Sequence, residues 1–166
     1  MLDPRDPTTR AAAVHEAGHA VIGRSLGIHC GGATIRPTKV ELGHAAIGNP
    51  LDGWHRGDGP RRELAKELVI SLYAGAEAER VILRSQLCGD EDDVALARPF
   101  LANCVRGSAS SEDHAAEEEK LRRRARELVD EYRERILLVA DELLTHGSLS
   151  GKDIDRLLAH PCPGRA

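Results

Sequence analysis

Residues 7–26, PTTRAAAVHEAGHAVIGRSL, form an alanine-rich stretch that predicts a helix. Asp6 before it is typical of a helix N-cap, and Gly27 after it is typical of a left-handed helix end. Within this predicted helix, His15 and His19 are one turn apart and about 40° apart around the axis. The two imidazoles therefore share one face and can reach one ion.

Glu16 completes the motif H-E-x-x-H and is offset by about 100° from His15, which places its carboxylate beside such an ion. Zinc suits neutral imidazoles, and a catalytic zinc site keeps one position for water beside three protein ligands. We therefore predict a zinc ion held by His15 and His19, with Glu16 as the general base that takes a proton from water. The alternative is a fortuitous pair of packed or surface histidines.

The third ligand does not follow from the motif. The longer pattern H-E-x-x-H-x-x-G-x-x-H is absent, because Ile22 and Ser25 stand where its glycine and third histidine would be. Acidic residues in the first turn of a helix also favour its positive end without any metal. Residue type alone thus leaves several candidates: Glu77, Glu79, Asp90, Asp92, Asp93, His29, His44 and His55.

The composition predicts a single, mainly helical domain over residues 1–166, since a chain of this length can bury about two thirds of its unfolded surface in one core. The chain is 41% hydrophobic but only 2% aromatic, which favours packed helices built from Ala, Leu, Val and Ile. The net charge is only -4, with both signs mixed along the chain, and the longest apolar run, 136–140, is short. We therefore expect neither a nucleic-acid partner nor a membrane span.

Four widely spaced cysteines form no C-x-x-C pair, and the N-terminus lacks the basic and apolar blocks of a secretion signal. Both features predict a reducing, cytoplasmic location.

A small β hairpin is predicted over residues 32–48. Its two β-favouring runs, 33–36 and 40–47, are separated by Pro37 and bounded by glycines. Residues 50–59 are dense in turn formers and are expected to form a loop near the hairpin.

A second helix is predicted over residues 60–84. Its small residues 74–76 would let the histidine helix approach closely at Gly18. Residues 89–106 contain an acidic turn and then a helix, which Pro99 is expected to disturb because it removes a backbone donor.

Residues 110–160 are predicted to form the closing helices. Ser110 begins a capping box that leads into one long, charged helical tract, Gly147 ends this tract, and Ser150 caps a short last helix. One apolar stripe is expected to be buried inside the same chain, with a partner or a second copy as the alternative: Leu121, Ala125, Leu128, Tyr132, Ile136, Val139 and Leu143.

Residues 14–21, VHEAGHAV, resemble the active-site helix of the FtsH-type ATP-dependent zinc metalloproteases. Residues 33–37 resemble the short strand of that family that ends in proline, and 41–44 resemble the strand that borders its cleft. Residues 72–79, LYAGAEAE, are similar to its glycine- and alanine-rich second helix. Residues 89–94, GDEDDV, stand where the family has a glycine followed four residues later by its zinc-binding aspartate.

The resemblance implies that Asp93 is the third zinc ligand. It also implies a helical zincin-type metallopeptidase domain, and a zinc metalloendopeptidase that acts on peptides or unfolded proteins. The segment 121–158 resembles the closing helices of the family. No part of this sequence resembles the ATPase module or membrane anchor of the family, so we expect proteolysis that is ATP-independent or served by a separate ATPase partner.

We expect an extended peptide to add as a strand along residues 40–47. His44 and His55 are candidate donors to the developing oxyanion, with solvent-facing roles as the alternative. Two rival functions are a zinc-binding adaptor without proteolytic activity and a helical interaction domain without metal.

Overall fold

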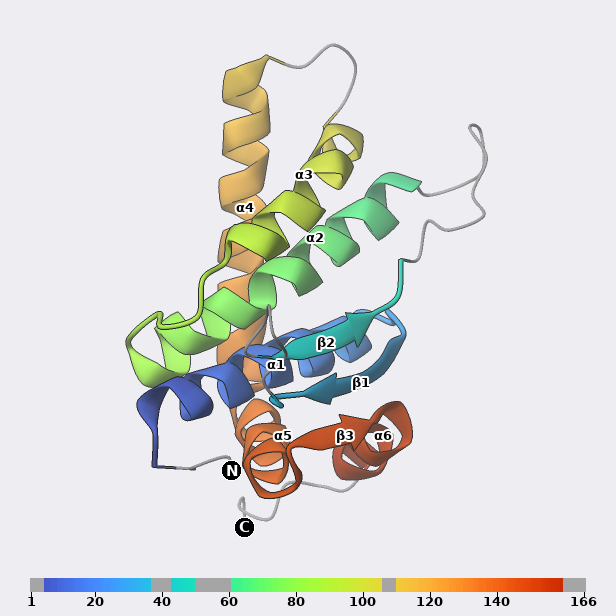
Figure 1. Cartoon of the computed structure of the whole chain (residues 1–166). Coiled ribbons are helices and arrows are strands. Elements are labelled where there is room, and N and C mark those ends of the chain that lie inside the picture. Colours follow the sequence, from blue (N-terminus) through green and yellow to red (C-terminus); the bar gives the residue numbers. More distant parts are fainter. Residues whose placement is uncertain (1–4, 37–42, 50–60, 106–109, 160–166) are drawn as a thin grey trace.

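The computed structural model describes residues 5–36, 43–49, 61–105 and 110–159. These residues form a mainly helical fold with one small antiparallel sheet, as predicted (Figure 1). In chain order the elements are α1 (Pro7–Ser25), β1 (Cys30–Thr34), β2 (His44–Ile47), α2 (Arg61–Ala78), the π-helical segment η1 (Glu79–Leu83), α3 (Glu91–Cys104), α4 (Ser111–Glu131), α5 (Arg133–His146), β3 (Ser148–Ser150) and α6 (Gly151–Ala159).

Helix α1 forms the centre of the fold and contacts α2, α5 and the sheet (Figure 1). As predicted, Asp6 is its N-cap: the side chain accepts a hydrogen bond of 2.8 Å from the Thr9 amide. Every residue from 11 to 23 is buried. Helices α1 and α2 cross at Gly18, where an added Cβ would lie 2.7 Å from the carbonyl oxygen of Ala74. This close crossing confirms the prediction from the small residues of both helices.

The sheet has the order β2-β1-β3, so the predicted hairpin is right only in part. Strand β1 begins at Cys30, earlier than predicted, and Thr34 pairs with His44 on β2 and with Ser148 on β3. Strand β3 was not predicted, because three residues are too few to show an alternating pattern. Residues 37–42 of the predicted hairpin and the predicted loop at 50–59 lie outside the described residues.

Two predictions about helix continuity are wrong. The charged tract is divided at Tyr132, which ends α4 and precedes α5, so the apolar stripe is carried by two helices. Helix α3 continues through Pro99 to Cys104, because the loss of one backbone donor does not break a helix that packs along α2.

The predicted ends of the C-terminal helices are confirmed. The side chains and amides of Ser110 and Asp113 form a reciprocal capping box, and Gly147 ends α5 with a φ of 76°. The stripe is largely buried in the core of this chain. Within the described part of the chain, we find no helix with the length and apolar character needed to cross a membrane.

Candidate metal centre

Three side chains from α1 and α3 converge on one point. The Oδ2 atom of Asp93 lies 3.0 Å from Nε2 of His15 and 3.2 Å from Nε2 of His19. These three atoms all lie within 4.8 Å of one another. Helix α1 supplies the histidines one turn apart, and the first turn of α3 supplies the aspartate. The fold thus brings together the two histidines of the motif and the aspartate that the resemblance implied as the third ligand.

The remaining ring nitrogen of each histidine is held by a buried acceptor. Nδ1 of His15 lies 2.7 Å from Oε1 of Glu79, and Nδ1 of His19 lies 2.8 Å from the carbonyl oxygen of Ser71. A carbonyl oxygen can only accept, so Nδ1 of His19 is the donor. A neutral imidazole with a proton on Nδ1 carries a lone pair on Nε2, the atom that faces Asp93. Acceptors of this kind orient histidine ligands in metal sites.

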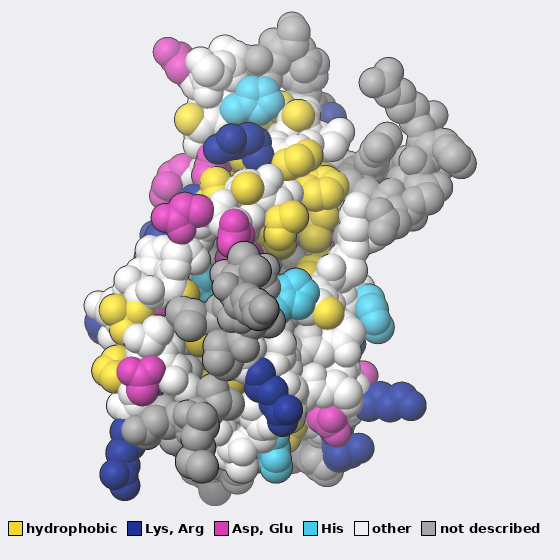
Figure 2. Space-filling model, viewed as in Figure 1, with side chains coloured by type: hydrophobic (Ala, Val, Ile, Leu, Met, Phe, Trp, Pro, Cys, Tyr) yellow, Lys and Arg dark blue, Asp and Glu magenta, His cyan; other side chains and the backbone are white. Residues whose placement is uncertain are grey.

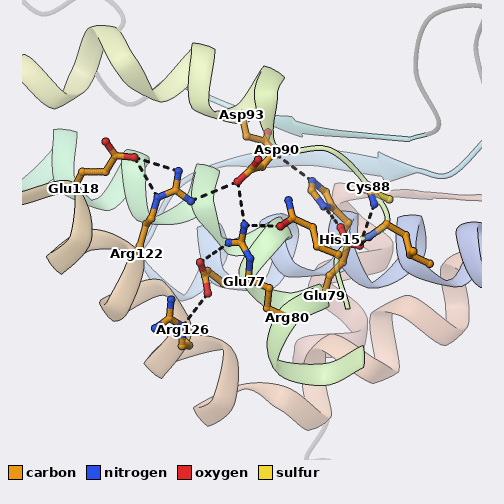
Figure 3. A network of polar contacts seen from close by, with 12 residues as sticks. His15, Glu77, Glu79, Arg80, Cys88, Asp90, Asp93, Glu118, Arg122 and Arg126 are labelled. Carbon is orange, nitrogen blue, oxygen red and sulfur yellow. Dashed lines mark hydrogen bonds and ion pairs between the residues drawn. The ribbon is translucent and has the colours of Figure 1, made fainter. Parts of the chain in front are cut away.

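Glu79 is itself fixed by the backbone that follows η1 (Figure 3). It is fully buried, and its Oε2 accepts hydrogen bonds from the amides of Leu87, at 2.7 Å, and Cys88, at 3.1 Å. Both Glu79 oxygens therefore have hydrogen-bond partners, and the carboxylate faces Nδ1 of His15 rather than the Nε2 that faces Asp93. The π-helical geometry of η1 begins at this residue, and such segments are frequent at functional sites.

The charges of this cluster are mutually stabilising. Burial opposes protonation of His15, but hydrogen bonds to Asp93 and Glu79 outweigh it and raise the pKa of His15 to about 10. Burial alone would raise the pKa of Asp93, but the charges of and hydrogen bonds from His19 and His15 hold it well below its usual range. The three side chains therefore form a buried ion-paired cluster.

The Glu16 carboxylate lies beside this cluster and is 7% exposed. Its Oε2 atom is buried and has no hydrogen-bond partner among the described residues. Burial raises the pKa of Glu16, against the opposing charges of His19 and His15. Gly43 covers the other oxygen, since an added Cβ there would lie 2.8 Å from Oε1. A buried carboxylate with one free oxygen is well placed to accept a proton from a small molecule such as water.

The centre opens into a cleft of about 640 Å³ between β2 and α3. Helices α1 and α2 also contribute to its lining, with Leu68 and Leu72 on α2. Figure 2 shows hydrophobic side chains gathered over α2 and α3, with acidic side chains beside them. His15, Glu16 and His19 lie among the residues that line this cleft.

Gly75 on α2 packs closely against both histidines. A Cβ at this position would clash with Nε2 of His19 and would lie 2.6 Å from Nε2 and Cδ2 of His15. The backbone of α2 therefore lies against the imidazoles at the Nε2 atoms that face Asp93, which only a residue without a side chain allows.

Arginine partners account for two of the other acidic candidates (Figure 3). Glu77 is fully buried and pairs with Arg80 at 2.7 Å and Arg126 at 2.9 Å. Asp90 lies 3.3 Å from Arg80 and 3.5 Å from Arg122. These ion pairs tie η1, α4 and the start of α3 together, and they leave neither carboxylate directed at the histidines.

The remaining candidates do not join the cluster within the described part of the chain. Asp92 and His44 both line the cleft and are exposed, and neither belongs to a group of metal-ligating atoms with the histidines. His29 is exposed and is not among the cleft residues. His55 lies outside the described residues.

A second group that could hold a metal consists of His15, Glu79 and Cys88. Burial and the charge of Glu79 raise the pKa of the Cys88 thiol to about 12, which disfavours the thiolate that metals bind. Because Glu79 already accepts from His15 and two backbone amides, we assign this group to the support of His15.

Sequence reasoning missed the role of Ser71, which acts through its backbone carbonyl and so leaves no mark in the residue type. It named Glu79 only as a candidate ligand.

No protein-family model matches this sequence, and no curated protein matches it.

Proposed function

We propose that this chain is a zinc-dependent endopeptidase with a zincin-type domain similar to that of the FtsH-type proteases. In this proposal His15, His19 and Asp93 hold the ion, and Glu16 is the general base. The observation that supports it most is the convergence of three metal-facing ligand atoms while Glu79 and Ser71 fix the opposite ring nitrogens.

The chemistry of this donor set fits zinc. Two imidazoles and one carboxylate are typical protein ligands of a catalytic zinc site, and three such ligands leave a fourth position free. A zinc ion there would supply a Lewis acid that polarises a carbonyl and makes a water ligand more acidic. The unpartnered Oε2 of Glu16 agrees with this assignment, since an unused buried carboxylate oxygen would only cost stability.

Glu16 performs the proton transfers in the proposed reaction. Its raised pKa makes it a stronger base than an exposed glutamate. Oε2 accepts a proton from the attacking water and then delivers it to the nitrogen of the departing amine. Gly43, which has no room for a Cβ beside the other oxygen, lies just before β2, an edge strand of the sheet. Addition of an extended peptide to β2 would bring its carbonyl past this carboxylate.

An adaptor that binds zinc without hydrolysing peptides is the principal rival. A structural site tends to take a fourth protein ligand and has no use for a base. Within the described residues, the metal-facing atoms come from three side chains, and Glu16 stands apart with a free oxygen.

Zinc content and turnover test the proposal together. The wild type is expected to bind one zinc per chain by elemental analysis, and Asp93→Ala to bind it far more weakly. Glu16→Gln should keep the zinc but cleave a denatured protein at least about a hundredfold more slowly, since general base catalysis contributes that much or more. Failure to retain zinc when it is supplied would refute the centre. Equal turnover by Glu16→Gln and the wild type would refute the role of Glu16.

A further inference from the structure

We propose that the cleft selects peptides that carry an apolar side chain and, two residues away in the extended chain, a lysine or arginine. This inference rests on the proposed peptidase function and names its substrate class. It comes from the α3 wall of the cleft, which the metal centre does not use beyond Asp93.

The apolar part of the site is a surface that the fold leaves unburied. Among the described residues, the large hydrophobic side chains that are exposed are Leu87, at 51%, and Leu96, at 58%. Both line the cleft, together with the partly buried Phe100. Because exposed apolar side chains gathered at a cleft typically mark a binding site, this wall is suited to an apolar group of the ligand.

The charged part of the site is acidic. The cleft residues with carboxylates are Glu16, Glu91, Asp92 and Asp93, and no lysine or arginine is among the described lining residues. Glu91 and Asp92 are exposed, and no ion pair or hydrogen bond engages their side chains within the described part of the chain. Arg98, on the same helix, is not part of the lining. A cationic side chain of the ligand would find partners here that the chain itself does not supply.

The spacing of residues along α3 relates the apolar part of the site to its acidic part. Asp92, Leu96 and Phe100 follow one another at four-residue steps and so lie on one helical face. Asp92 and Leu96 are about 6 Å apart along the axis. In an extended peptide, side chains on the same side are two residues and about 6.6 Å apart. A peptide that lies along α3 can therefore place an apolar side chain at Leu96 and a cation at Asp92 when the two are separated by one residue.

Binding to the zinc-loaded Glu16→Gln protein tests this register without dependence on turnover. The probes are fluorescent nonapeptides of Gly, Ala and Ser with one Leu and one Arg. In two of them Arg stands two residues before or after Leu, and in a third it stands next to Leu, on the opposite side of the extended chain. A fourth peptide has Ser in place of Leu, and a fifth has Glu in place of Arg.

One of the two spaced peptides is expected to bind about tenfold more tightly than the Ser peptide, from burial of one leucine. It should bind about threefold to fivefold more tightly than the adjacent-Arg peptide, from one partly exposed ion pair. Leu96→Ser should remove the preference for the spaced Leu peptide over the Ser peptide. The double variant Glu91→Gln, Asp92→Asn should remove the preference for the spaced peptide over the adjacent-Arg peptide. Glu112→Gln, at the exposed first turn of α4, should change neither preference.

Equal binding of all five peptides, or of none, would overturn the inference. Cleavage of a denatured protein by the wild type but not by Glu16→Gln would still establish the peptidase in that case. A Glu peptide that binds as well as the Arg peptide would refute the cationic part of the register.

Discussion

Gly75→Ala is the substitution for which the structure predicts the sharpest effect on the metal centre. The new methyl carbon would lie 2.6 Å from Nε2 of His15. Non-bonded atoms of this kind need about 3.5 Å, so the imidazole must retreat by about 0.9 Å. Metal sites tolerate about 0.2 Å in a ligand distance. We therefore expect zinc affinity to fall by at least about a hundredfold, the upper end for substitutions that only support a ligand.

The fold itself should change little in this variant. Alanine is favoured over glycine in a helix by about 1 kcal/mol, and overpacking costs about 1–3 kcal/mol, so the metal-free protein loses at most about 2 kcal/mol. Competition with a chromogenic chelator measures zinc affinity, and thermal unfolding in excess chelator measures the stability of the metal-free fold.

Gly23→Ala is the matched control. Gly23 is also helical and buried, but its added Cβ would meet Ile47 at an ordinary 3.5 Å. This variant should keep its zinc affinity and gain about 0.5–1 kcal/mol of stability. Unchanged zinc binding by Gly75→Ala would refute the placement of the histidines against α2.

Three further outcomes are expected. Glu79→Gln should weaken zinc binding by about tenfold or more, measured by chelator competition, because it removes the charge that orients His15. Arg80→Ala leaves the buried Glu77 with Arg126 alone and should lower the free energy of unfolding by about 1–3 kcal/mol in urea titrations, whereas Arg124→Ala, at an exposed pair, should lower it by less than about 1 kcal/mol. In the metal-free protein, burial disfavours protonation of His15, but hydrogen bonds to Asp93 and Glu79 raise its pKa from 6.5 to about 10. The protonated imidazole therefore stabilises the fold fully below pH 6.5, and this stabilisation is lost as the pH rises toward 10. Thermal unfolding in chelator should show this decline, and a flat profile from pH 7 to 10 would contradict it.

Local signals in the sequence were sufficient to predict most helices. Asp6, Ser110 and Gly147 mark helix ends through contacts within a few residues, and the structure places all three as predicted. Strand β3 depends instead on pairing with β1, and Ser148 and Thr34 are far apart in the sequence. A three-residue strand has too little pattern of its own to reveal such a partner.

The centre was predictable to the extent that residue type determines it. The histidines and Glu16 form a short motif that can be recognised in the sequence. Residue type does not distinguish one candidate carboxylate from another. Only the packed structure shows that Glu77 pairs with arginines, that Glu79 supports His15 and that Asp93 meets the histidines. The predicted effect of Pro99 failed for a related reason, because contacts with α2 outweigh the local preference.

The position of β1 between β2 and β3 has a consequence for the order of events during translation. The proposed ligands and base all lie within the first 93 residues, but α1 packs against α5, and the sheet that borders the cleft is completed only by Ser148–Ser150. Contacts between such distant segments form late in folding. A ribosome would therefore have to synthesise the chain past Ser150 before the proposed hydrolytic centre could be completed.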